Sequence, residues 1–144
     1  MNQPVYDWFI GYEGPVGRDL ERRARYVEFQ ARMTAPVYKQ VPGNPLPNQR
    51  VGGQLKASIS RRREAKTPEG LTYLVGANPR RGGPKGDAYW QHEGAGPHVI
   101  LPRFAKALRF YWVRIGEVVI TKRVNHPGNP ALKYISRWLP RAVR

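Results

Sequence analysis

The order of apolar and polar residues predicts a long amphipathic helix near the start of the chain. Between residues 16 and 35, apolar or small residues recur at spacings of three and four and form one stripe. Pro36 ends this predicted helix, because the residue before a proline avoids the α region. The stripe is narrow and rich in alanine, so we expect close packing against a sheet or another helix. It consists of Leu20, Ala24, Val27, Ala31 and Thr34.

Alternation of apolar and polar residues predicts two β-hairpins. Residues 55–59 and 71–75 alternate on either side of a Pro-Glu-Gly turn, which favours a hairpin over residues 55–77. The spacing of Leu55 and Ile59 also fits one helical turn, so this alternative stays open. Residues 108–115 and 118–124 alternate around Gly116 and predict the second hairpin.

Two further elements complete the predicted fold. Residues 89–93 are expected to form a short strand. Asn129 and Pro130 are expected to be the N-cap and the first-turn proline of a C-terminal helix, which ends at Pro140. The prediction is an α+β fold with a mainly antiparallel sheet of about five strands, an N-terminal and a C-terminal helix, and an extended proline-rich arm. The residues expected to be buried in the last helix are Ala131, Leu132, Ile135, Trp138 and Leu139.

The length of 144 residues indicates a single domain, residues 1–144. Residues 1–15 form an aromatic N-terminal arm that either caps the core or docks on a neighbouring molecule. Residues 36–53 form a proline-rich loop or arm, which is either an interface or a surface loop without order. Residues 54–139 are expected to contain the core.

The chain is strongly basic, with 25 Lys and Arg residues, 10 Asp and Glu residues and a formal net charge of +15. This charge favours a polyanionic partner such as a nucleic-acid backbone, or acidic faces of neighbouring protein subunits. After Gly94 the only acidic residue is Glu117. The candidates for facing DNA or an acidic partner are Arg61, Arg62, Arg63, Arg80, Arg81 and Lys85.

Several classes of chemistry are not expected. The absence of cysteine excludes disulfides and thiolate chemistry. His92, His98 and His126 match no helix-borne metal motif, and on a strand His92 and Glu93 would point to opposite faces. We expect His98 and His126 to hydrogen-bond the backbone of proline-rich turns. An enzyme, a cofactor, a metal, a signal peptide and a membrane partner are therefore not expected.

Four short motifs occur in a fixed order in the second half of the chain. They are an aromatic segment that ends at Glu93-Gly94, a P-H-x-I-x-P segment at residues 97–102, K-A-L-x-F at residues 106–110, and V-x-H-P-G at residues 124–128. An upstream G-x-L-x-x-S-I segment precedes them. The motif residues are Gly53, Leu55, Ser58, Ile59, Glu93, Gly94, Pro97, His98, Pro102, His126, Pro127 and Gly128.

This order, over roughly residues 50–139, resembles the neck or tail-completion proteins of long-tailed bacteriophages, which join the head to the tail. The resemblance implies a structural virion protein, assembled in the host cytoplasm, that forms a homo-oligomeric ring, commonly a hexamer in that family. Its partners would be connector or head-completion proteins and tail-tube or tail-terminator proteins, and the lumen allows double-stranded DNA to pass. The alternative is a stand-alone basic nucleic-acid-binding protein. His92 and the long arm before Gly53 depart from the family pattern.

Overall fold

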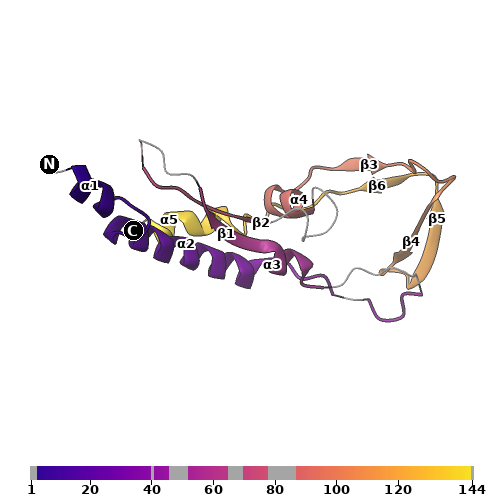
Figure 1. The fold of residues 1–144 in the computed structure, drawn as a ribbon. Coiled ribbons are helices and arrows are strands. Elements are labelled where there is room, and N and C mark those ends of the chain that lie inside the picture. Colours follow the sequence, from indigo (N-terminus) through magenta and orange to yellow (C-terminus); the bar gives the residue numbers. More distant parts are fainter. Residues whose placement is uncertain (1–2, 40, 46–51, 65–69, 78–86, 144) are drawn as a thin grey trace.

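The computed structural model describes residues 3–39, 41–45, 52–64, 70–77 and 87–143 as an elongated α+β chain (Figure 1). The longest helix and the first pair of strands lie at one end, which we call the helical end. Two further pairs of strands lie at the opposite end, which we call the strand end. The two ends present very different surfaces, and the candidate sites divide between them.

The helical end is built on α2, Pro15–Thr34, which confirms the helix predicted at residues 16–35. The middle of the predicted stripe, Ala24, Val27 and Ala31, is buried. Before α2, the segment predicted to be an aromatic arm forms a short helix, α1, Gln3–Phe9. After α2, the described residues between Pro36 and Gly53 contain no helix or strand.

Residues 54–63 combine one turn of helix with a strand. The turn is α3, Gln54–Ser58, and it leads into β1, Ile59–Arg63. β1 pairs antiparallel with β2, Tyr73–Ala77, with Ile59 opposite Ala77. The predicted hairpin is therefore confirmed from Ile59 onward, and the helical-turn alternative is correct for the residues before it. Both strands pack against α2.

The core lies where α2, β1 and the C-terminal segment meet. Ala31, Ala35, Ile59 and Tyr134 form a buried cluster. Tyr134 is only 1% exposed, and its hydroxyl donates a hydrogen bond to the Ala88 carbonyl oxygen at 3.1 Å. The small residues of α2 leave the space that this large side chain fills. Tyr134 was missed as a core residue from the sequence.

The strand end contains two separate antiparallel pairs. β3, His98–Ile100, pairs with β6, Val124–His126, and β4, Leu108–Trp112, pairs with β5, Glu117–Thr121. The hairpin predicted around Gly116 is confirmed, with shorter strands. The single sheet of about five strands is wrong, because the described strands form three two-stranded sheets. β1 and β2 pack against α2 at the helical end, far from the other strands (Figure 1).

The strand predicted at residues 89–93 is wrong, because this segment forms the helix α4, Asp87–Glu93. The helical conformation aligns Ala88 and His92, four residues apart, toward Tyr134. The Ala88 carbonyl accepts the Tyr134 hydroxyl, and the His92 ring packs edge-on against the Tyr134 ring at 5.2 Å. These contacts outweigh the strand preference of the aromatic residues.

The predicted C-terminal helix begins too early. Residues 129–135 form no helix, and the chain turns into a 3₁₀-helix, η1, Ser136–Trp138, followed by α5, Leu139–Ala142. Asn129 pairs with Ala95 instead of capping a helix, and Pro140 lies in the first turn of α5 rather than ending a helix. Three residues predicted to be buried are exposed as a result: Ala131, Leu132 and Leu139.

Candidate assembly and anion-facing surfaces

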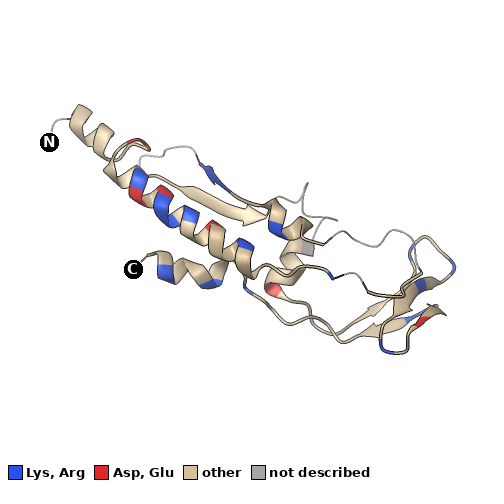
Figure 2. Ribbon diagram, turned by 90° about the horizontal axis from the view of Figure 1, so that it is seen from below, with Lys and Arg blue, Asp and Glu red and all other residues tan. Residues whose placement is uncertain are grey.

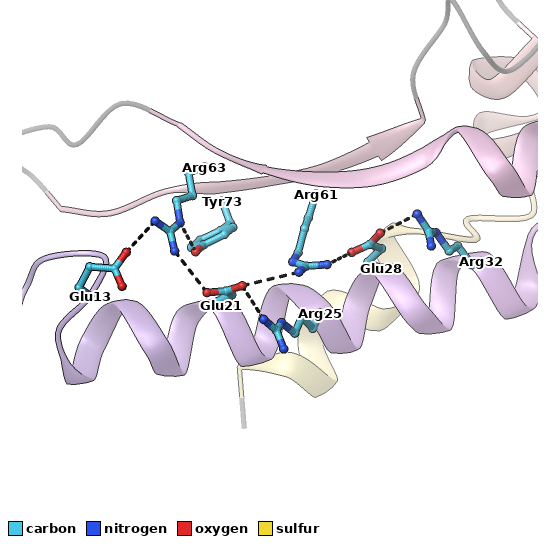
Figure 3. A network of polar contacts seen from close by, with 8 residues as sticks. All are labelled: Glu13, Glu21, Arg25, Glu28, Arg32, Arg61, Arg63 and Tyr73. Atoms are coloured by element: carbon cyan, nitrogen blue, oxygen red, sulfur yellow. Dashed lines mark hydrogen bonds and ion pairs between the residues drawn. The ribbon is translucent and has the colours of Figure 1, made fainter.

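An ion-pair network joins β1 to α2 and includes two of the predicted basic site residues (Figure 3). Arg61 pairs with Glu28 and lies 3.6 Å from Glu21. Arg63 pairs with Glu13 at 2.9 Å and with Glu21 at 3.5 Å. Arg61 and Arg63 are two apart on a strand and therefore point to the same face. That face is turned toward α2, so these two arginines bind carboxylates of their own chain.

Two further arginines of α2 and the hydroxyl of Tyr73 complete the network. Arg25 pairs with Glu21 at 2.9 Å, and Arg32 pairs with Glu28 at 2.8 Å. Arg32 also donates two hydrogen bonds to the Ile59 carbonyl oxygen at 2.9 and 2.7 Å. Arg63 donates from Nε to the Tyr73 hydroxyl at 2.9 Å. The network therefore fixes the hairpin on the helix.

The electrostatic effects on these groups follow from the contacts. The hydrogen bond from Arg25, followed by the charges of Arg25 and Arg63, lowers the pKa of the Glu21 carboxyl. The hydrogen bond to Glu28 raises the pKa of the Arg61 guanidinium. Hydrogen bonds to Tyr73 and Glu13 likewise raise the pKa of Arg63. Each shift favours the charged form of the group.

These contacts predict an acid-sensitive contribution of Glu21 to stability. Because the pKa of Glu21 is lower in the folded chain, its contribution is present above about pH 5 and is lost as the pH falls below about 4. We expect Glu21→Gln to lower the Tm by a few degrees at pH 7, and the difference from wild type to shrink toward pH 3. Glu117→Gln, on β5, is the matched control, because it removes the same charge outside the network. A constant Glu21→Gln difference in thermal melts from pH 7 to pH 3 would contradict the assignment.

The remaining predicted basic residues are placed differently. Arg62 lies on the opposite face of β1 from Arg61 and Arg63, and its side chain is largely exposed, 3.5 Å from Glu64. It is the member of the Arg61–Arg63 group that remains accessible to an external anion. Arg80, Arg81 and Lys85 lie outside the described residues, so their expected role stays a prediction.

The strand end carries cations that lie outside the basic clusters predicted from the sequence (Figure 2). Within the described part of the chain, these side chains make no ion pair with a carboxylate, in contrast to Arg61 and Arg63. Phe104, 94% exposed, lies under the Arg103 guanidinium at 5.2 Å. The excess of basic over acidic residues after Gly94 was the sequence signal for this surface. We call the six basic residues of this surface the hairpin cations: Arg103, Lys106, Arg109, Arg114, Lys122 and Arg123.

The family-motif residues of the second half come together in one place, which we call the motif node: residues 94–98 and 126–129. Ala95 and Asn129 exchange backbone hydrogen bonds of 3.0 and 2.8 Å. Gly94 and Gly128 have φ of +80° and +89°, a region that favours glycine. A Cβ at Gly128 would lie 2.2 Å from the Ala95 carbonyl oxygen. The two glycines therefore permit the close approach that forms the node.

The histidines serve the backbone in the way predicted for His98 and His126. His98 Nδ1 lies 2.9 Å from the Gly96 carbonyl oxygen, and His126 Nδ1 accepts from the Gly128 amide at 3.0 Å. The two rings face each other across β3 and β6, 4.9 Å apart. Among the described residues, no three His, Cys, Asp or Glu side chains are grouped closely enough to hold a metal.

The relation predicted between His92 and Glu93 is wrong, because both lie on α4. His92 Nδ1 lies 2.7 Å from the Glu93 carboxylate, which also pairs with Lys133. The hydrogen bonds from Lys133 and then His92 lower the pKa of Glu93. His92 Nε2 accepts the Ser136 amide at 3.2 Å. These contacts fasten α4 to the C-terminal segment.

The other motif residues are structural. Gly53 precedes α3, Leu55 packs against the core, Ser58 is buried with its hydroxyl bonded to the Leu55 carbonyl, and Ile59 is fully buried. Pro97 and Pro102 flank β3, and Pro127 follows β6. The motif at residues 53–59 thus contributes to the core at the helical end, and the motifs at residues 97–102 and 124–128 meet in or beside the motif node. The K-A-L-x-F motif at residues 106–110 leads into β4 instead.

Large apolar side chains remain exposed on both ends of the chain. On α1 they include Val5, Trp8 and Phe9, and on α2 they include Phe29 and Met33. At the strand end, Trp112 and Ile120 are exposed on opposite faces of the β4–β5 hairpin. Ile120 lies directly opposite Arg109, and Arg109 and Trp112 are three residues apart on β4, so their side chains point to opposite faces. A two-stranded hairpin alone is marginally stable in water. Such surfaces are typical of chains that are covered by another molecule.

Comparison with protein-family models, with curated proteins and with solved structures finds no match to this chain. No helix in the described ranges combines the length and the apolarity needed to cross a lipid bilayer.

Proposed function

We propose that the chain is a structural subunit of a homo-oligomeric ring at the neck of a long-tailed bacteriophage, where it joins the head connector to the tail. The observation that carries the proposal is the amount of surface left uncovered. The chain exposes 10,996 Å². A compact protein of 16.5 kDa exposes about 7,600 Å² by the scaling for folded monomers.

The excess of roughly 3,400 Å² has the size of a permanent interface. Obligate interfaces bury about 2,000–5,000 Å² in total, and a ring subunit contributes to two of them. Exposed aromatic and aliphatic side chains at both ends supply the apolar area that such interfaces need. The order of the four motifs, which resembles that of phage neck proteins, supports the neck as the place of this ring.

The neck function is tested by removing the gene from the phage that encodes the chain. We expect lysates that contain DNA-filled heads and separate tails, and we expect joined virions to reappear when purified protein is added. Electron microscopy of the lysates makes the distinction. Normal virions without the chain, or a block in head filling alone, would overturn the neck assignment.

The second candidate, a stand-alone nucleic-acid-binding protein, is favoured by the hairpin cations. They lie on the β4–β5 hairpin and in the segments directly before and after it, without carboxylate partners in the described residues, whereas Arg61 and Arg63 are neutralised within the chain. The same cations also suit a ring whose surface meets DNA or an acidic neighbour. The two candidates differ in the order of assembly, because a ring former assembles without nucleic acid.

Binding of double-stranded DNA tests the hairpin cations directly. We expect weak, sequence-independent binding with a slope of about −4 in log K against log salt, for four to five phosphate contacts. Arg109→Glu with Lys122→Glu should reduce the slope to about −2. The matched pair Lys39→Glu with Lys56→Glu makes the same charge change at two exposed lysines outside the hairpin cations and should leave the slope near its wild-type value. Equal effects of both pairs in fluorescence anisotropy titrations would assign the binding to net charge alone.

A further inference from the structure

The helix α1 is apolar on almost every side and has little contact with the rest of its chain. It lies beyond the N-terminal end of α2 and extends away from the body (Figure 1). Trp8 is 59% exposed and Phe9 is 48% exposed, and Val5 and Tyr6 are exposed as well. A seven-residue helix of this kind does not stay folded in water without a partner surface.

The connection between α1 and α2 is a tight corner that sets the direction of α1. A Cβ at Gly14 would lie 2.0 Å from the Trp8 carbonyl oxygen, and one at Gly17 would lie 2.4 Å from the backbone of Tyr12. The corner is therefore packed backbone against backbone. The Tyr12 hydroxyl also donates to the Thr72 carbonyl oxygen at 3.0 Å, which fastens the corner to the strands. The direction of α1 is thus set outward.

The outer face of α2 offers a matching apolar surface. Tyr26, Phe29 and Met33 follow each other at spacings of three and four, on the side opposite the buried Ala24 and Val27. Phe29 is 59% exposed and Met33 is 60% exposed. The helix α5 packs beside this stripe, where Tyr26 shares a hollow with Arg141 and Ala142, and the side chains of Phe29 and Met33 remain more than half exposed. This is the spacing by which one helix anchors another in a groove.

The net charges of the two helices are opposite. The helix α1 carries one acidic residue, Asp7, and no Lys or Arg. The helix α2 carries five Arg and three acidic residues, and Arg22, four residues before Tyr26, has an 80% exposed side chain that pairs with Asp19 at 2.5 Å. A helix with one negative charge and a helix with an excess of two positive charges on the same chain favour contact between two copies.

We propose that α1 of one subunit docks on the stripe of Tyr26, Phe29 and Met33 of the next copy, and that this contact closes the ring. The donor and the acceptor are different patches, so each contact leaves one free α1 and one free stripe. Addition continues until the ring closes. The inference rests on the proposed homo-oligomer and identifies the surfaces that build it.

The absence of cysteine allows a direct test by crosslinking. The variant Trp8→Cys with Phe29→Cys should form, under mild oxidation, a ladder of disulfide-linked species up to the ring size in non-reducing gels. Trp8→Cys alone can give only dimers. Ile120→Cys with Phe29→Cys is the matched control, because Ile120 is 69% exposed but lies on β5 at the strand end. A ladder no longer than that of this control would overturn the donor–acceptor contact.

A mixing experiment separates this inference from the ring itself. Trp8→Glu lacks a working donor and Phe29→Glu lacks a working acceptor, so we expect each alone to be monomeric in native mass spectrometry. An equimolar mixture restores one intact contact per pair and should give a one-to-one dimer and nothing larger. Rings formed by Trp8→Glu alone would reject the α1 contact and leave the ring in place. A wild-type chain that stays monomeric would reject both.

Discussion

Replacing Tyr134 by alanine is expected to lower the free energy of unfolding by about 4 kcal/mol, the largest effect of any single side chain in the described core. The Tyr134 ring fills the space between Ala31, Ala35 and Ile59, and the core cluster contains few other large side chains. The substitution would leave a cavity that these small residues cannot close. It would also remove the hydroxyl that binds the Ala88 carbonyl oxygen.

Tyr134→Phe is the matched control for this result, because it keeps the ring and removes only the hydroxyl. We expect it to cost about 1 kcal/mol, the net value of one hydrogen bond. Chemical denaturation followed by circular dichroism measures both variants. If the alanine variant were no less stable than the phenylalanine variant, Tyr134 would not be the centre of the core.

Gly128→Ala is expected to cost about 3 kcal/mol or more and to open the motif node. The cost of a positive φ for alanine is about 1–2 kcal/mol. To this is added the displacement of the Ala95 carbonyl oxygen, which lies 2.2 Å from the position of the new Cβ. The hydrogen bonds between Ala95 and Asn129 should be lost, so their amide protons should exchange faster with solvent.

Gly116→Ala separates strain from clash. Gly116 has φ of +73°, but the nearest atom to its Cβ position is the Tyr111 hydroxyl at 3.8 Å. We therefore expect a loss of about 1–2 kcal/mol from strain alone. Equal losses for the two glycine variants, with unchanged exchange at Ala95, would show that the node does not depend on close approach.

The sequence predicted the elements whose pattern is local. The alanine-rich stripe predicts the helix α2, and the alternation around Gly116 predicts the β4–β5 hairpin. Each pattern involves only residues close together in the sequence, and both elements are confirmed. The segment at residues 89–93 was wrong because its conformation depends on Tyr134, some forty residues further on. Asn129 was wrong as an N-cap because its backbone pairs with Ala95. Contacts of this range leave no periodic signal.

The basic site residues show the same limit. The pairing of Arg61 and Arg63 with α2 had a signal in the sequence, since Glu21 and Glu28 are seven residues apart and share one face of the helix. Which arginine pairs with which glutamate also depends on how β1 lies along α2, and the sequence does not show that position. The exposed cations of the strand end follow more directly from composition, because the chain beyond Gly94 has almost no acid to neutralise them.

The central claim, that the chain builds a ring, is tested most directly by the mass of the purified wild-type protein from light scattering at low and high salt. We expect one discrete species that persists at high salt, because apolar contacts hold the ring together. Six chains of 16.5 kDa would give about 99 kDa. A monomer at every concentration, which gains mass only with DNA and loses it at high salt, would contradict the ring and favour the nucleic-acid-binding alternative.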